Sequence, residues 1–249
     1  SETPSAEAMS HAARLMQIAP DLMAKSSQIA LKHYRNLSEV MTKDDQSPLT
    51  KADLEVNSFL CDALGEAFPQ IALVTEERAD SHGLDVGNSM FFLVDPIDGT
   101  KEFIHGRDEF TVNVALIENR KPVAGIVGAP ALGMYYSGIA GQGAQRTMLE
   151  TGTAEDISVS MPGEDGLMVI ASRSHLTPET QAFIDANTVA GTRNAGSSLK
   201  FCLLAAGEAD VYPRYGPTME WDTAAGHAVL VAAGGTVMQL DGSPLEYAK

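Results

Sequence analysis

The chain has 249 residues, of which 44% are hydrophobic and 20% charged, and its 33 acidic and 17 basic residues give a formal net charge of −16. A chain of this length buries a substantial core, either as one large domain or as two smaller lobes. The acidic balance argues against binding a nucleic-acid polymer or an anionic membrane, because both favour basic surfaces. A small anionic substrate is still compatible with this net charge, provided that bound metal ions make the binding site locally positive.

Cysteine content and hydropathy bear on the cellular compartment. Cys61 and Cys202 are far apart and in no CxxC pattern, which argues against a disulfide framework or a zinc site and fits a reducing compartment. No apolar run approaches the roughly 20 residues of a membrane span, and no basic-then-apolar signal opens the chain. We therefore expect a cytoplasmic protein, monomeric or dimeric, that is at most peripheral at the inner membrane.

The first third of the chain predicts two helices and a short strand. The expected elements are a helix over 6–35, a polar loop over 41–50, a helix over 50–68, a strand over 71–75 and a mobile polar loop over 78–89. Pro20 should kink or restart the first helix because it lacks an amide donor. Thr50 is the expected cap of the second helix, with Asp53 at the capping-box position. The short strand delivers Glu76 and Glu77 at its end.

The next stretch combines a core strand with acidic residues. Five apolar residues at 90–94 predict a buried strand that runs directly into Asp95-Pro-Ile-Asp-Gly-Thr100. Asp95, Asp98 and the bare carbonyl of Ile97 supply the oxygen ligands that Mg2+ prefers. Amides at a following helix start would hold a phosphate beside the ion. The alternative is an ordinary surface turn rich in Asp, Pro and Gly.

Beyond this stretch, strands are expected first, and then strands alternate with helices. The first group comprises a half-buried strand over 110–117, a hairpin turn at 118–121, strands over 123–128 and 134–139, and a glycine turn at 138–143. A polar composition over 151–165 indicates a lobe boundary, giving an N-terminal α+β lobe at 1–155 and a C-terminal α/β lobe at 156–249. The second group comprises strands over 167–171, 209–212 and 236–240 and helices over 177–187, 198–206 and 223–233.

Carboxylates recur at the ends of expected strands and the starts of expected helices. These are Asp53, Glu76, Asp95, Asp98 and Asp222. Each alone has an ordinary explanation, such as a helix cap. If they converge, repulsion and desolvation would force some to hold protons unless two or three Mg2+ ions are bound. Paired ions stabilise both the attacking and the leaving oxygen in phosphoryl transfer, so the acidic residues predict a metal-dependent phosphatase.

Several motifs together resemble the inositol monophosphatase superfamily over nearly the whole chain. They are Glu76-Glu77, Asp95-Pro-Ile-Asp-Gly-Thr100 and Trp221-Asp-Thr-Ala-Ala-Gly226. Four further stretches are similar to its CysQ-type 3'(2'),5'-bisphosphate nucleotidases: 43–53, 101–103, 196–201 and 210–221. The resemblance implies a layered αβαβα sugar-phosphatase fold, with a mostly antiparallel N-terminal lobe and a smaller α/β C-terminal lobe. It also implies that relatives continue for a further strand beyond residue 249.

The resemblance assigns a role to each site residue. Glu76, Asp95 and the Ile97 carbonyl would bind one Mg2+; Asp95, Asp98 and Asp222 would bind a second; and Glu76, aided by Glu77, would hold a weaker third ion with its water. Asp53 and Thr100 would position and deprotonate the attacking water, and the Gly99 and Thr100 amides would hold the phosphate. The implied substrate contacts are Ser197, Ser198, Lys200 and Arg214.

The implied activity is removal of the 3'-phosphate of 3'-phosphoadenosine 5'-phosphate, with the 2' isomer and 3'-phosphoadenylyl sulfate as further candidate substrates and lithium as an inhibitor. Inositol phosphatases tend to carry an acidic residue near Arg214, and an arginine there favours a second phosphate. Three alternatives stay open: an inositol- or sugar-phosphate phosphatase of the same superfamily, a haloacid dehalogenase phosphatase, and a non-catalytic cation- or nucleotide-binding protein. The three-residue spacing of Asp95 and Asp98 disfavours the second, whose aspartates are two apart.

Overall fold

A seven-stranded sheet forms the centre of the computed structural model, which describes residues 3–37, 47–75, 90–172, 176–215 and 219–247. Its strands are β1 (Ala72–Thr75), β2 (Met90–Asp98), β3 (Thr111–Glu118), β4 (Lys121–Ala129), β5 (Met134–Ile139), β6 (Gly143–Met148) and β7 (Ala154–Ile157). They lie in chain order, β1 pairs parallel with β2, and every later pair is antiparallel. The predicted antiparallel character of this part of the chain is confirmed.

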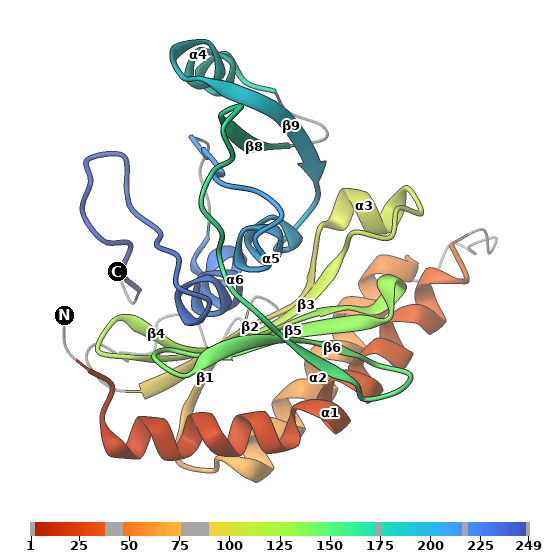
Figure 1. The fold of residues 1–249 in the computed structure, drawn as a ribbon. Helices are drawn as coiled ribbons and strands as arrows, with labels where there is room; N and C mark the ends of the chain where they lie inside the picture. Colours follow the sequence, from red (N-terminus) through yellow and green to blue (C-terminus); the bar gives the residue numbers. More distant parts are fainter. Residues whose placement is uncertain (1–2, 38–46, 76–89, 173–175, 216–218, 248–249) are drawn as a thin grey trace.

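Helices cover both faces of the sheet (Figure 1). Helices α1 (Ala6–Tyr34) and α2 (Pro48–Ala67) pack on one face, and α5 (Leu199–Ala205) and α6 (Glu220–Ala232) pack on the other. Beyond α5 lies a parallel pair, β8 (Leu167–Ser172) and β9 (Val189–Ala195), with α4 (Pro178–Ala186) at the far end. A short helix, α3 (Thr100–Ile104), follows β2, and a 3-10 turn, η2 (Pro130–Leu132), follows β4. The predicted layered αβαβα fold is confirmed.

Strand β3 is buried on both faces, so the prediction of a half-buried strand at 110–117 is wrong. Val114 and Leu116 enter the core under α1 and α2. Ala115 and Ile117 enter the second core, under α5 and α6. Because helices cover both faces of the sheet, alternate side chains of β3 enter two different buried layers. The alternation therefore does not separate core residues from solvent-facing ones.

Helix α1 continues through Pro20 for 29 residues, so the expected restart of the helix there is wrong. Pro20 itself is exposed, whereas Leu15, Ala19 and Leu22 on either side of it are almost fully buried. A proline in a helix interior costs about 3 kcal/mol. Burial of several apolar side chains, at roughly 1.5–3 kcal/mol each, outweighs that cost.

Helix α2 begins earlier than predicted. Ser47 and not Thr50 is its N-cap, because the Ser47 hydroxyl oxygen accepts the Thr50 amide at 3.1 Å. Pro48 then occupies the first turn, where its missing amide donor does no harm. Asp53 therefore lies within the helix and not in a capping box. The predicted loops at 41–50 and 78–89 lie largely or wholly outside the described residues.

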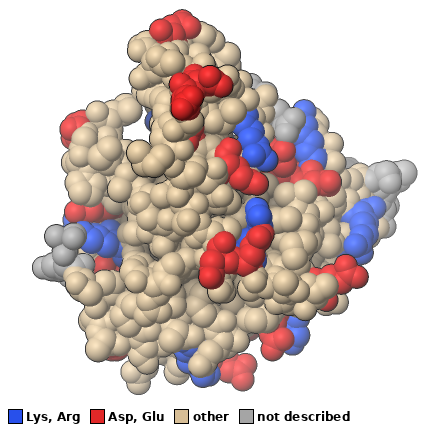
Figure 2. Space-filling model, viewed as in Figure 1, with Lys and Arg blue, Asp and Glu red and all other residues tan. Residues whose placement is uncertain are grey.

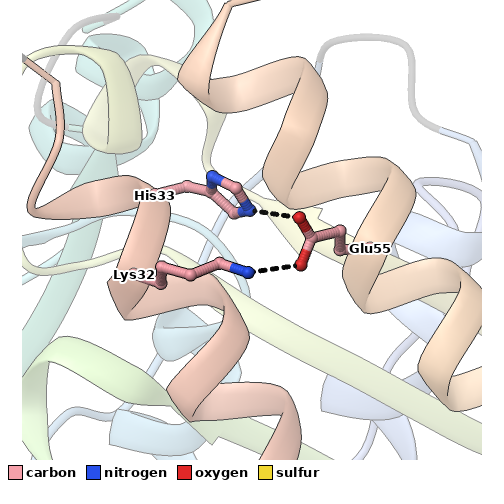
Figure 3. Close-up of polar contacts among 3 residues, drawn as sticks. All are labelled: Lys32, His33 and Glu55. Atoms are coloured by element: carbon pink, nitrogen blue, oxygen red, sulfur yellow. Dashed lines mark hydrogen bonds and ion pairs between the residues drawn. The ribbon is translucent and has the colours of Figure 1, made fainter. Parts of the chain in front are cut away.

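The side chains of three residues join the first two helices. Lys32 Nζ lies 2.7 Å and His33 Nε2 lies 3.0 Å from the two carboxylate oxygens of Glu55 (Figure 3). The hydrogen bond from Lys32 is the main reason that the pKa of Glu55 is lowered. Glu55 follows Asp53 by two residues, so this cluster fixes the first turns of α2 against the end of α1.

In the C-terminal part, the predicted helices are confirmed but two predicted strands are wrong. Residues 209–212 and 236–240 each contribute only an isolated bridge, Val169 with Val211 and Met238 with Pro244. Pro213 follows the first bridge closely and has no amide to extend a ladder. The sequence pattern missed β9, whose residues are mostly exposed or partly exposed and carry little apolar periodicity. Helix α6 begins at Glu220, three residues before its predicted start.

Acidic and basic side chains both lie on the face of the molecule that Figure 2 draws. Figure 2 shows acidic and basic side chains beside one another, without a continuous basic area on the face drawn. Among the described helices, none is long and apolar enough to span a bilayer. Strand β7 extends the central sheet to Ile157, and α6 packs on that sheet although it lies near the C-terminus. The division into lobes at residue 155 stays a prediction.

Candidate active site

Three of the predicted carboxylates come together at one end of the central sheet. Asp95, Asp98 and Asp222 each place a carboxylate oxygen so that these atoms lie within 4.8 Å of one another. The first two stand at the end of β2, and the third is in the first turn of α6. Carboxylate oxygens are the donors that hard cations such as Mg2+ prefer, so the cluster fits a divalent metal ion.

A bulge in β2 explains how two aspartates three residues apart reach one site. In a regular strand, residues three apart point to opposite faces. Here Asp95 pairs with Asn113 and Asp98 pairs with Thr111, and the register skips Pro96 and Ile97. The two partners are two residues apart on β3 and share a face, so the extra residue in β2 returns Asp98 to the face of Asp95. Helix α6, which carries Asp222, covers that face.

Gly99 connects the cluster to α3 and is required there for two reasons. Its φ of +82° lies in the left-handed region, which side chains disfavour. A Cβ atom at this position would also lie 2.9 Å from Ser197 Cβ and 3.3 Å from Phe110 Cα. The Gly99 amide donates to Asp98 Oδ1 at 3.0 Å. Thr100 begins α3 and is exposed.

The electrostatics of Asp98 favour a bound cation. Burial of the carboxyl group, followed by repulsion from Asp222, raises the pKa of Asp98 to about 6. The Ser198 hydroxyl, the charge of Lys200 and the Gly99 amide oppose this rise without cancelling it. Two carboxylates this close resist joint ionisation, and a cation between them removes the difficulty.

Asp53 lies on a face of α2 that is fixed against the ends of β1 and β2. Asn57 follows Asp53 by four residues and shares its face of the helix. The Asn57 side-chain oxygen accepts the Thr75 hydroxyl at 2.6 Å, and Thr75 pairs with Val94, the residue before Asp95. Asp53 itself is partly buried. The predicted ligands Glu76 and Glu77 come directly after Thr75 and lie outside the described residues.

The predicted substrate residues fall into two groups. Ser198 reaches the carboxylates, because its hydroxyl donates to Asp98 Oδ2 at 3.0 Å. Lys200 and Arg214 meet at another point: Lys200 Nζ lies 3.1 Å and Arg214 NH1 lies 3.4 Å from the hydroxyl oxygen of Tyr212. The Lys200 ammonium also lies 5.0 Å from the centre of the Tyr212 ring.

Sequence reasoning missed Tyr212 and Glu109 as parts of this region. Tyr212 lies within one of the motif stretches, next to Arg214, and that proximity was the available signal. Glu109 contacts the turn that carries Ser197 and Ser198: its side chain accepts the Gly196 amide at 2.7 Å, and its carbonyl oxygen accepts the Ser197 hydroxyl. No local pattern connects residues this far apart in the chain.

The layered fold and the carboxylate cluster together define an α+β protein with an acidic cluster, suited to a divalent metal ion, at the end of its central sheet. Residues 11–249 match the model of the inositol monophosphatase family. The 3'(2'),5'-bisphosphate nucleotidase CysQ of Escherichia coli O6:H1 is 43% identical over 211 residues, covering 84% of this chain and 83% of that protein. The chain belongs to the inositol monophosphatase family.

Solved structures agree with this membership. The crystal structure of CysQ from Bacteroides thetaiotaomicron has a TM-score of 0.80 at 36% identity, covering 96% of this chain and 93% of that one. Mycobacterium tuberculosis SuhB has a TM-score of 0.72 at 27% identity, covering 93% of this chain and 89% of that one. The family resemblance inferred from the motifs is therefore confirmed.

Proposed function

We propose that this protein is a Mg2+-dependent phosphatase that removes the 3'-phosphate of 3'-phosphoadenosine 5'-phosphate by direct attack of water, giving AMP and phosphate. The observation that carries the proposal is the cluster of Asp95, Asp98 and Asp222 in a chain that is 43% identical to a bisphosphate nucleotidase. Phosphoryl transfer requires charge stabilisation at both the attacking and the leaving oxygen, and an acidic site holding divalent ions provides it.

In this mechanism the carboxylates of Asp95, Asp98 and Asp222 would hold Mg2+, and Glu76 and the Ile97 carbonyl would be further ligands. Bound Mg2+ lowers the pKa of water and offsets the negative charge of the phosphate. Asp53, aided by Thr100, orients the attacking water and takes its proton, as a carboxylate general base can do near neutral pH. Glu76, aided by Glu77, would hold a weaker third ion, as the family resemblance implies.

The positively charged side chains of Lys200 and Arg214, which meet at Tyr212, support a substrate that carries a second phosphate. Lys200 and Arg214 both donate to the Tyr212 hydroxyl, so two positive side chains converge on one neutral oxygen. A phosphate offers several charged acceptors, and an arginine can bind two of them at once. An inositol monophosphate has no second phosphate for this pair. The site therefore favours a bisphosphate nucleotide, with the reacting phosphate beside Gly99, Thr100, Ser197 and Ser198.

Phosphate release from purified protein with Mg2+ tests the proposal, comparing 3'-phosphoadenosine 5'-phosphate with inositol 1-phosphate. We expect kcat/KM to be much higher for the nucleotide. Arg214→Gln should raise KM for the nucleotide by roughly tenfold, the loss of one charge-assisted contact, whereas Arg193→Gln on exposed β9 should change little. A preference for the inositol ester would overturn the nucleotide assignment but not the phosphatase class.

A further inference from the structure

Close contacts join the turn between β9 and α5 (residues 196–198) to the segment that follows Asp98 (residues 99–102), and we call this contact region the seam. A Cβ atom on Gly99 would lie 2.9 Å from Ser197, and one on Gly196 would lie 2.7 Å from the buried carboxyl group of Glu102. Position 99 requires glycine because of its left-handed φ and its close backbone neighbour Phe110, and the missing side chain at Gly196 leaves room for Glu102. The seam brings residues 196–198 beside Asp98, about 100 positions away in the chain.

Glu109 holds this turn at two points. Its Oε2 atom accepts the Gly196 amide at 2.7 Å, and its main-chain oxygen accepts the Ser197 hydroxyl. Ser197 has a φ of +53°, a left-handed conformation that residues with a side chain disfavour. Such a conformation persists only where neighbouring groups impose it. Glu109 supplies two of those restraints.

The next residue in the turn transmits this restraint to the cluster. Ser198 is 1% exposed, and its hydroxyl donates to Asp98 Oδ2, while the Gly99 amide donates to Asp98 Oδ1. Both oxygens of the carboxylate are thus oriented by donors on either side of the seam. Outer groups that orient a ligand in this way commonly control metal affinity by 10-fold to 100-fold.

We propose that Glu109 is a positioning residue: it fixes the Gly196–Ser198 turn so that Ser198 orients the Asp98 carboxylate and the turn is held ready for the phosphoester. The inference rests on the proposed function for the identity of the substrate, but not for the effect on metal binding. The two hydrogen bonds that Glu109 accepts from Gly196 and Ser197 carry this role.

Calorimetric titration of the full chain with Mg2+, without substrate, tests this role. Glu109→Ala removes the acceptor of the Gly196 amide and should weaken Mg2+ binding by roughly tenfold. Glu109→Gln keeps an acceptor oxygen of the same reach and should return the affinity to within about threefold of the wild type. The matched control is Glu155→Ala, which removes an exposed partner of Arg146 and should leave Mg2+ affinity unchanged.

Thermal unfolding separates positioning from a merely structural role. A structural role would lower the unfolding temperature of Glu109→Ala without weakening Mg2+ binding, and that result would overturn the proposal. If Glu109→Ala does not fold, Ser198→Ala tests the same path, and wild-type Mg2+ affinity in that variant would equally overturn it. Failure of the nucleotidase assignment would show instead as absent nucleotide hydrolysis by the wild type, with the Glu109→Ala effect on Mg2+ retained.

Discussion

Replacing Asp98 by asparagine should stabilise the metal-free protein while removing its tight binding of Mg2+. Burial and the neighbouring Asp222 raise the pKa of Asp98 from 3.8 to about 6. At 1.36 kcal/mol per pKa unit, the charged form costs the metal-free fold about 3 kcal/mol at most at neutral pH. Partial exposure of the side chain and loss of one carboxylate acceptor reduce the expected gain for Asp98→Asn to about 1–2 kcal/mol.

The sign of this effect depends on pH. The folded-state pKa of Asp98 lies above the unfolded value, so the folded metal-free protein binds more protons between about pH 4 and pH 6. The Asp98 contribution to stability is therefore present below about pH 4 and is lost as the pH rises through about 6. The Asp98→Asn variant does not lose this stability, so its free energy of unfolding should exceed that of the wild type at pH 7.5 but not at pH 4.

Urea unfolding with EDTA or with saturating Mg2+ measures the effect directly. In Mg2+ the order of stability should reverse, because the wild type gains about 2.7 kcal/mol at a metal concentration 100 times its Kd. Asp156→Asn is a suitable control, since Asp156 is exposed and accepts one hydrogen bond from Gln145. If Asp98→Asn is less stable than the wild type in EDTA at pH 7.5, the electrostatic reasoning is wrong.

Three further predictions test other parts of the site and fold. Asp53→Asn should fold and bind Mg2+ but lose most phosphatase activity; retained turnover would remove Asp53 from its role as base. Gly125→Ala places a Cβ atom 2.7 Å from the Ala225 carbonyl oxygen, so it should lower the free energy of unfolding, measured in urea, by about 1–3 kcal/mol. By shifting α6, which carries Asp222, it should also weaken Mg2+ binding. An unchanged free energy of unfolding would contradict this packing. Burial lowers the pKa of His227 from 6.5 to about 4. The free energy of unfolding should therefore fall by up to about 3 kcal/mol as the pH is lowered through this range. His227→Gln should flatten that part of the plot of unfolding free energy against pH.

The sequence predicted the fold class and the acidic residues of the site because both leave local signals. An apolar run that enters Asp95-Pro-Ile-Asp-Gly-Thr100 predicts a core strand that ends in candidate metal ligands, and the structure places Asp95 and Asp98 in the acidic cluster at the end of β2. The start of α2 was placed wrongly because Ser47 and Thr50 are both plausible caps, and local sequence does not decide between them. The packing that fixes these elements is not a local property.

The contacts that complete the site could not be predicted from the pattern, because they join distant residues. Glu109 and Gly196 are 87 positions apart, and Ser198 and Asp98 are 100 apart. Their pairing depends on β9, a strand with too little apolar periodicity to be recognised. Tyr212 was assigned to a strand that is only a single bridge, although its hydroxyl is where Lys200 and Arg214 meet.

The wrong prediction for β3 has its cause in the polar residues that lie opposite the acidic cluster. Thr111 and Asn113 are the polar residues in the alternation that predicted a half-buried strand, yet they are 0% and 1% exposed. They lie opposite Asp98 and Asp95, and the Asn113 amide donates to the Asp95 carbonyl oxygen and to the Thr111 hydroxyl. Buried polar residues in a core strand carry a cost unless they are hydrogen-bonded. Here they line the face where the β2 bulge brings two aspartates together. The polar residues of the alternation therefore support the acidic cluster and do not face solvent.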